Sequence, residues 1–108
     1  MAEQRTEYRK LGYAKVLLNN LPGYLRNLTG EGCKVVTFSP LPQKQNETVS
    51  MKILPDETSG LDPVSLTAEL CWELTEGPYY EYGFHIASFD TPPGREIYRK
   101  LVGLYGRS

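Results

Sequence analysis

The residues from Ser65 to Leu74 alternate between apolar and polar more regularly than any other part of this 108-residue chain. A period of two predicts a β-strand with one buried face. Leu66, Ala68, Leu70, Trp72 and Leu74 occupy the apolar face, and Thr67, Glu69, Cys71 and Glu73 occupy the other. A turn containing the pair Gly77 and Pro78 follows, and Tyr79 to Ala87 resumes the alternation. We therefore predict an antiparallel β-hairpin in this part of the chain.

Four further strands are predicted before this hairpin, from short apolar and β-branched runs that are bounded by turn residues. They span Tyr13–Leu18, Gly23–Leu28, Cys33–Phe38 and Thr48–Leu54. Short antiparallel strands at this spacing favour a barrel, because closure removes the exposed edges that an open sheet would leave.

The last part of the chain changes to a helical period. A Pro-Pro pair suits the first turn of a helix, and Ile97, Leu101 and Leu104 recur at helical spacing. We expect a helix over about residues 93–105 that packs its apolar side on the barrel, with a groove on a partner as the alternative. The predicted fold is thus mainly β, a six-stranded antiparallel β-barrel with a C-terminal α-helix.

Composition narrows the classes of function. A net charge of −1 argues against broad binding of DNA or RNA, which usually relies on a basic face. No apolar run approaches the ~20 residues that cross a bilayer, and no apolar signal segment begins the chain, so we expect a cytoplasmic protein without membrane insertion. Cys33 and Cys71 show no metal-ligand spacing, and we expect them to pack without forming a disulfide. We expect neither a metal nor a cofactor.

Arg5 and Arg9 form an R-x-x-x-R motif ahead of the first predicted strand. Each guanidinium presents a planar fork of donors that matches phosphate oxygens or the O6/N7 edge of guanine. Two such forks four residues apart can hold two parts of one anionic ligand from a single flexible segment. The alternative is a pair of solvated surface arginines, since the motif by itself is common.

Asn27, Thr29 and Gly32 form an N-x-T-x-x-G motif between the second and third predicted strands. Asn27 offers amide donors and an acceptor, and Thr29 offers a hydroxyl. Gly30 and Gly32 permit backbone angles and a close approach that a side chain would block. The motif suits hydrogen bonding to a flat base. The alternative is a glycine-containing turn in which Asn27 and Thr29 satisfy only the local backbone.

In their order along the chain, these motifs resemble the PilZ domain family. An R-x-x-x-R arm precedes the first strand, an N-x-T-x-x-G turn joins the second strand to the third, and Gly83 lies in a late strand before the terminal helix. The resemblance covers essentially the whole chain. It implies a flexible N-terminal arm over residues 1–12 and a PilZ β-barrel domain over residues 13–108.

Many PilZ domains are receptors for the bacterial second messenger cyclic di-GMP. The resemblance implies that Arg5 and Arg9 hold the guanines and phosphates of this ligand as the arm folds over it. It also implies that Asn27 and Thr29 are the base-binding polar pair, and that Gly32 is the glycine of the turn.

The resemblance further implies that Gly83 keeps the barrel floor open beneath a base. One departure from the family pattern is Thr29, where the family usually has serine. The added methyl group stiffens the side chain and could crowd the base. Further residues that could contribute to the same site are Gln4, Lys10, Arg26 and Gly30.

We therefore expect a nucleotide-binding signalling protein, a cyclic di-GMP receptor whose N-terminal arm orders on binding and presents a new surface to a downstream protein. The alternative is a PilZ-like adaptor that does not bind nucleotide. We do not expect an enzyme, because the single histidine, His85, belongs to no acid–base dyad and the sequence has no nucleophile or phosphate-loop motif.

Overall fold

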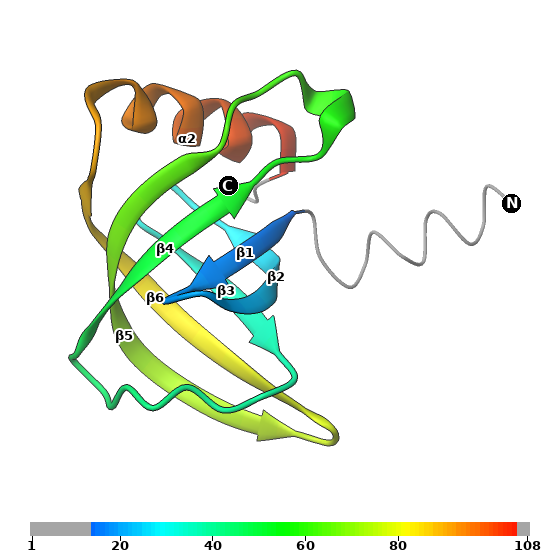
Figure 1. Ribbon diagram of the computed structural model, residues 1–108, viewed down its shortest axis with the longest axis vertical. Helices are drawn as coiled ribbons and strands as arrows, with labels where there is room; N and C mark the ends of the chain where they lie inside the picture. The colour runs from blue at the N-terminus through cyan, green and yellow to red at the C-terminus, as the bar shows by residue number, and fades with distance from the viewer. Residues whose placement is uncertain (1–13, 106–108) are drawn as a thin grey trace, which may run out of the picture.

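The computed structural model describes residues 14–105, apart from the side chains of Thr58, Glu76 and Tyr105. The chain forms a closed six-stranded antiparallel β-barrel followed by one C-terminal helix (Figure 1). This architecture confirms the fold predicted from the sequence. The predicted arm over residues 1–12, which contains Gln4, Arg5, Arg9 and Lys10, lies outside the described residues.

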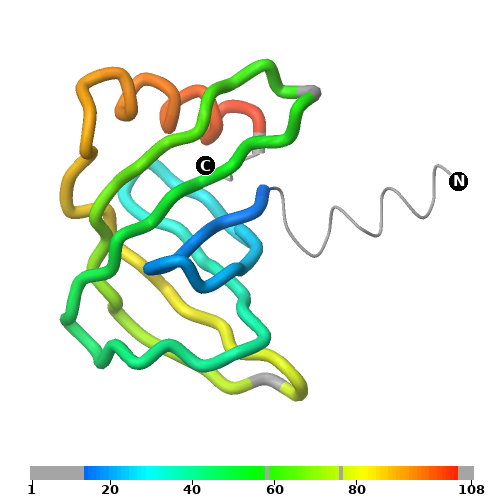
Figure 2. The backbone as a smooth tube through the Cα atoms, in the orientation of Figure 1, coloured from blue at the N-terminus to red at the C-terminus, as the bar shows by residue number. Residues whose placement is uncertain are grey.

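The strands are β1 (Lys15–Leu18), β2 (Leu21–Leu28), β3 (Gly32–Thr37), β4 (Thr48–Leu54), β5 (Val64–Glu76) and β6 (Tyr79–Phe89). A 3-10 turn, η1 (Glu57–Ser59), lies between β4 and β5, and helix α2 (Pro92–Tyr105) follows β6. The order around the barrel is β1-β2-β3-β6-β5-β4, and the pairing of β1 with β4 closes it. Strands β5 and β6 form a long curved hairpin along the barrel (Figure 2).

The β1–β2 hairpin is tighter than the sequence suggests. Asn19 and Asn20 have φ angles of 49° and 75°, so both residues adopt left-handed backbone angles. Leu18 and Leu21 pair directly, which makes a two-residue turn of the kind whose twist suits a hairpin. The gap between the predicted strands Tyr13–Leu18 and Gly23–Leu28 is therefore longer than the observed turn, because asparagine tolerates the left-handed region that a two-residue turn requires.

Inward-facing side chains from the strands fill the barrel interior. They include Val16, Leu18, Leu25, Val35, Met51, Ile53, Leu66, Leu70 and Tyr82, all of which are at most 1% exposed. Full burial of one aliphatic side chain of this size contributes roughly 1.5–3 kcal/mol. This interior is therefore the main source of stability, and it leaves the outer face of the strands free to carry a site.

Helix α2 lies across one end of the barrel (Figure 1). Leu101 is fully buried and Tyr98 is 2% exposed, while Ile97 and Val102 pack partly against the same core. Leu104, which was predicted to share the apolar stripe, is instead 58% exposed. At about 100° per residue, Leu104 lies roughly a quarter-turn from the centre of the buried stripe, which Tyr98 completes instead.

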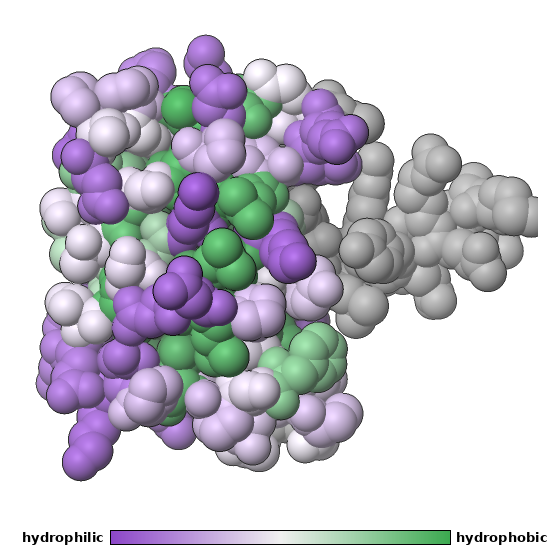
Figure 3. Space-filling model, viewed as in Figure 1, coloured by the Kyte–Doolittle hydropathy of each residue, from purple (hydrophilic) through white to green (hydrophobic). Residues whose placement is uncertain are grey.

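The outer face over β1 and β4 carries polar side chains with small apolar patches between them (Figure 3). Strand β4 alternates as predicted, with Val49, Met51 and Ile53 buried and Thr48, Ser50 and Lys52 exposed. The prediction of a half-buried strand over Thr48–Leu54 is confirmed.

Within residues 14–105, no helix has both the length and the apolar character needed to cross a membrane.

The alternation predicted for β5 changes phase within the strand. The pairing of β5 with β6 shifts between Leu70 and Trp72, where Cys71 is an extra residue. Such a β-bulge turns the following side chains to the opposite face. Leu70 is 1% exposed, whereas Trp72 and Leu74 point outwards and are 42% and 48% exposed. The prediction that Trp72 and Leu74 share the buried face is wrong for this reason.

Trp72 is the only tryptophan in the chain, so its fluorescence tests the bulge directly. Because the indole is 42% exposed, we expect the native protein to show an emission maximum typical of an indole in contact with water. Acrylamide should quench this emission substantially without unfolding the protein. A blue-shifted emission that acrylamide leaves unchanged would place Trp72 in the barrel interior and contradict the change of phase.

Candidate functional site

A row of four residues crosses the outer face of the barrel on four neighbouring strands. Asn27 of β2 pairs with Lys34 of β3. Lys34 pairs in turn with Gly83 of β6, which pairs with Trp72 of β5. The bulge in β5 aligns one end of this row, and a second bulge at Arg26 in β2 aligns the other. We call this set, Asn27, Lys34, Gly83 and Trp72, the outer row.

The outward direction of the outer row follows from the positions beside it. Leu28, Cys33 and Phe84 follow or precede Asn27, Lys34 and Gly83 directly in sequence, and Leu70 lies across the bulge from Trp72; all four are at most 8% exposed. Since neighbouring residues in a strand point to opposite faces, the outer row lies on the outside of the barrel. One residue further along β3 and β6, the strands face outwards again, and Gly32 pairs with His85 there.

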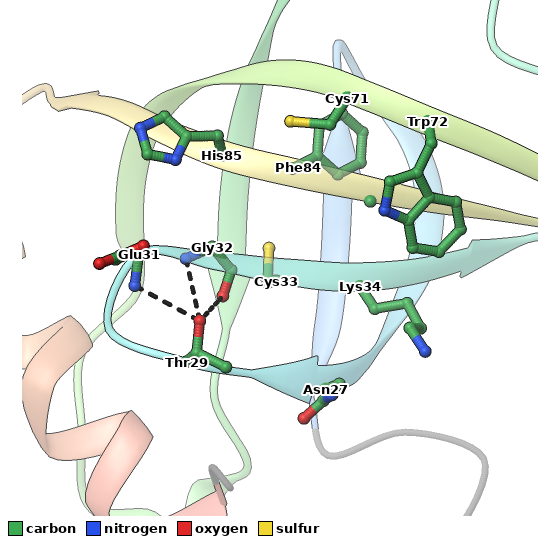
Figure 4. Close-up of a pocket in the computed structure, with 11 residues that line it drawn as sticks. Asn27, Thr29, Glu31, Gly32, Cys33, Lys34, Cys71, Trp72, Phe84 and His85 are labelled. Atoms are coloured by element: carbon green, nitrogen blue, oxygen red, sulfur yellow. Dashed lines mark hydrogen bonds between the residues drawn. The ribbon is translucent and has the colours of Figure 1, made fainter. Parts of the chain in front are cut away.

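A pocket of about 300 Å³ lies over these two outward-facing rows and the turn between β2 and β3. Trp72 and Lys34 lie at one end of the pocket, and His85 lies at the other (Figure 4). Two of the positions that line it, Gly32 and Gly83, carry no side chain. The outer surface is therefore hollowed where two glycines stand among larger neighbours.

The indole of Trp72 lies against Gly83. A Cβ atom at position 83 would clash with Cε2 and Nε1 of the indole, so only glycine lets the ring lie here. Lys34 extends over the same ring, with Nζ 5.8 Å from the ring centroid, which is a cation–π arrangement. The floor that we expected to be open at Gly83 is thus covered by a partly exposed aromatic ring beside an ammonium group.

The Thr29 hydroxyl organises the turn that follows β2. Its Oγ1 atom accepts hydrogen bonds from the N–H of Glu31 at 3.4 Å and of Gly32 at 3.2 Å, and it donates to the Gly32 carbonyl at 3.2 Å (Figure 4). The N–H of Thr29 donates to the same carbonyl at 2.9 Å. The hydroxyl has one proton, and the turn uses it. Thr29 therefore satisfies local backbone groups, which is the alternative considered for this motif.

Asn27 makes a local contact with half of its amide. Its Oδ1 atom accepts a hydrogen bond from the N–H of Leu28 at 2.9 Å. The Nδ2 group has no acceptor within residues 14–105, and the side chain lines the pocket. Asn27 can therefore donate hydrogen bonds to an oxygen or a ring nitrogen of a ligand in the pocket.

The two glycines of the turn differ in what the structure requires of them. A Cβ atom at Gly32 would clash with the carbonyl oxygen of Phe84 in β6, so the close pairing of β3 with β6 needs glycine here. A Cβ atom at Gly30 would have no atom within 4 Å, and Gly30 does not have a positive φ. Contrary to expectation, neither close approach nor unusual backbone angles explain the glycine at position 30.

Cys33 lies in the core directly beneath the pocket. Its thiol is buried, with Sγ 3.8 Å from Sδ of Met51. Burial raises the pKa of Cys33 to about 12, because a thiolate there would lose its hydration. Cys71, the bulge residue in β5, is half-buried and is also a free thiol. Cys33 is therefore a neutral packing group and not a nucleophile.

The structure brings together four of the residues that the resemblance singled out, which are Asn27, Thr29, Gly32 and Gly83. Arg26 and Gly30, the secondary candidates within the described residues, do not line the pocket. The lining also includes Lys34, Trp72 and His85, which the motifs did not contain. Their places depend on pairing between strands that are far apart in sequence, and alternation alone had assigned Trp72 to the core.

No protein-family model and no curated protein matches this sequence. In the described part of the chain, no group of three or more His, Cys, Asp or Glu side chains is placed to hold a metal ion. The lining offers an aromatic face, an ammonium group and amide donors, which suit an anionic ligand that carries flat rings.

Alanine substitutions at the two turn glycines should give different results. Gly32→Ala forces a methyl group against the Phe84 carbonyl, and we expect the free energy of unfolding to fall by about 1–3 kcal/mol. Gly30→Ala has room, and it should leave this free energy unchanged or raise it by about 0.5 kcal/mol, because alanine restricts the unfolded chain. Urea titrations measure both values. Equal losses in the two variants would contradict the close approach of β3 to β6.

The two cysteines should differ in reactivity in the native protein. The raised pKa keeps the Cys33 thiol protonated, so at about pH 8 iodoacetamide should modify Cys71 and leave Cys33 intact until urea is added. Between pH 9.0, the ordinary pKa of a thiol, and about pH 12, Cys33 is ionised in the unfolded chain but still protonated in the folded chain. The free energy of unfolding should therefore fall as pH rises through this range. Peptide mass spectrometry measures the modification. Equal rates at both cysteines in the native state would contradict the burial of Cys33.

Proposed function

We propose that this chain is a receptor of the PilZ type and that its pocket binds cyclic di-GMP. The observation that carries the proposal is the convergence of Asn27, Thr29, Gly32 and Gly83 on one pocket. These residues come from β2, the following turn, β3 and β6, and the resemblance assigns all of them to the ligand site. Gly83 lies far from the other three in sequence, so their convergence is independent of the motif spacing.

The entry of the chain into the barrel supports a role for the arm. The Ala14 carbonyl accepts a hydrogen bond from the N–H of Leu25 at 2.8 Å, so the chain enters beside the part of β2 that leads to Asn27. Arg9 is five residues before Ala14, and an extended chain of that length spans at most about 17 Å. In this proposal the arm turns back from this point of entry and brings the guanidinium groups of Arg9 and Arg5 to the pocket.

Three groups in the pocket, those of Trp72, Lys34 and Asn27, match parts of this ligand, which carries two guanines and two phosphate charges. The partly exposed indole of Trp72 can stack on one guanine, an interaction worth about 1–3 kcal/mol per base. The Lys34 ammonium lies beside that ring and can pair with a phosphate. The Nδ2 group of Asn27 can donate to the edge of a base. At about 300 Å³, the pocket is at the lower end of the range for small-molecule sites, so the arm would cover the rest of the ligand.

The charge of the pocket supports a role for the arm in this proposal. Among the described residues that line it, Lys34 is the only lysine or arginine, and Glu31 carries a negative charge at the other end. A ligand with two negative charges therefore needs further cations, which Arg5 and Arg9 supply in this proposal. Binding should accordingly weaken as ionic strength rises.

A second candidate function is an adaptor of the same fold that does not bind nucleotide. The observation that favours it is the Thr29 hydroxyl, whose proton and lone pairs are used within the turn. To bind a base, Thr29 would have to give up its bond to the Gly32 carbonyl. In an adaptor, the turn would only shape a surface that a partner protein recognises.

Isothermal titration calorimetry with cyclic di-GMP tests the receptor function. We expect the wild type to bind, with a change in Trp72 fluorescence as a base covers the indole. Arg9→Ala should weaken binding at least about tenfold without lowering the melting temperature, since a charge-assisted contact is worth roughly 1.5–3 kcal/mol. Lys34→Ala should weaken binding by a smaller factor, because a single ammonium contact is not bidentate.

Arg99→Ala is the matched control, because Arg99 is exposed on α2 and does not line the pocket. It removes the same charge from the chain and should leave the affinity unchanged. A folded wild type that releases no heat and shows no fluorescence change on titration would defeat the receptor function. Co-purification of a partner protein regardless of added nucleotide would then favour the adaptor.

A further inference from the structure

Tyr98 connects helix α2 to the turn that lines the pocket. The side chain is 2% exposed, and its ring packs against Phe89 with the ring centroids 5.6 Å apart. Its hydroxyl lies 2.7 Å from the carbonyl oxygen of Thr29 and 3.0 Å from that of Gly32, and it donates to this pair of acceptors. A buried ring thus carries one polar atom directly to the two ends of the turn.

The two carbonyls that Tyr98 contacts are not equivalent. The Gly32 carbonyl also accepts hydrogen bonds from the N–H and the hydroxyl of Thr29. The Thr29 carbonyl has no other donor among the residues that the structure describes. Loss of the Tyr98 hydroxyl would therefore leave a partly buried carbonyl without a protein partner and would loosen the turn at its first residue.

The Tyr98 hydroxyl keeps its proton under ordinary conditions. Burial, and to a smaller extent the Cys33 thiol, raise the pKa of Tyr98 well above its usual range. The neutral hydroxyl is the form that can donate to a carbonyl. The contact between the helix and the turn is therefore present across the physiological pH range.

We propose that Tyr98 is a positioning residue that couples the ligand pocket to helix α2. Through its hydroxyl, a docked α2 holds the turn in the shape that lines the pocket, and a ligand that fixes the turn holds α2 more firmly on the barrel. The two effects are reciprocal, because a coupling free energy between two sites acts equally in both directions. The identity of the ligand rests on the proposed function, whereas the coupling rests on the contact itself.

The coupling gives α2 a role in relaying the signal. Its exposed positions include Arg95, Arg99 and Lys100, which are positively charged, and Glu96, which is negatively charged, so this side of the helix has a net positive charge. When the ligand fixes the turn, the helix that carries these groups samples fewer undocked positions. A downstream protein with an acidic surface would then meet a better-ordered helix of net positive charge.

A pair of tyrosine-to-phenylalanine variants of the full chain tests this proposal. Tyr98→Phe removes the hydroxyl that reaches the turn and keeps the buried ring. Tyr82→Phe is the matched control, because Tyr82 is 1% exposed and its hydroxyl accepts one hydrogen bond, from the N–H of Leu41 at 2.8 Å, which lies outside the pocket lining. Each variant is titrated with cyclic di-GMP by calorimetry, and amide hydrogen exchange is followed with and without the nucleotide.

We expect Tyr98→Phe to weaken binding of cyclic di-GMP about fivefold, the equivalent of one net hydrogen bond, and Tyr82→Phe to leave it unchanged. In the wild type and in Tyr82→Phe, the nucleotide should slow the exchange of amides in α2. In Tyr98→Phe this protection of α2 should be lost. In the nucleotide-free protein, Tyr98→Phe should speed the exchange of the Glu31 and Gly32 amides together with that of α2.

Three results would overturn the coupling. The first is wild-type affinity and wild-type protection of α2 in Tyr98→Phe. The second is an equal loss of affinity in both variants, which would mark a general effect of stability. The third is an unchanged exchange of the turn and helix amides in nucleotide-free Tyr98→Phe. This comparison needs no ligand, so it tests the coupling even if the wild type binds no cyclic di-GMP and the proposed function fails.

Discussion

Two β-bulges, one in β2 and one in β5, hold the candidate site together. In a regular strand, the period of two would turn Trp72 towards the interior, which Leu70 and its neighbours already fill. The extra residue in β5 sends the indole outwards instead, and the extra residue in β2 brings Asn27 opposite Lys34. Because the barrel is closed, the registers of its strands are linked, and a slip of one strand cannot replace either bulge.

The pocket depends equally on two missing side chains. Gly32 lets β3 approach the Phe84 carbonyl, and Gly83 lets the indole of Trp72 lie against the sheet. The same glycines therefore serve the packing of the barrel and the shape of the site. A variant at Gly83 that loses ligand binding would report a displaced indole as much as a lost contact, so stability and affinity have to be measured together.

Two backbone carbonyl oxygens of the turn, those of Thr29 and Gly32, contact the Tyr98 hydroxyl of the helix, and the Gly32 carbonyl has further donors. The Gly32 carbonyl accepts hydrogen bonds from the N–H of Thr29, from its hydroxyl and from the hydroxyl of Tyr98. A ligand that drew the Thr29 hydroxyl away would change the partners of the acceptor that Tyr98 shares. The Thr29 hydroxyl bond that counts against a direct role in base binding therefore shares its acceptor with the bond that connects the turn to α2.

The sequence by itself determined the types of the elements, because strand period, turn residues and helix spacing are local properties. It predicted both ends of β4 and the barrel with its terminal helix, and it pointed to Asn27 and Gly32. Only the tertiary structure decided that Trp72, Lys34 and Tyr98 belong with them. A bulge is defined by pairing with a neighbouring strand, and the bond from Tyr98 to the turn joins residues 69 apart in the chain. No local pattern records such contacts, since they form only when the barrel closes and the helix docks on its end.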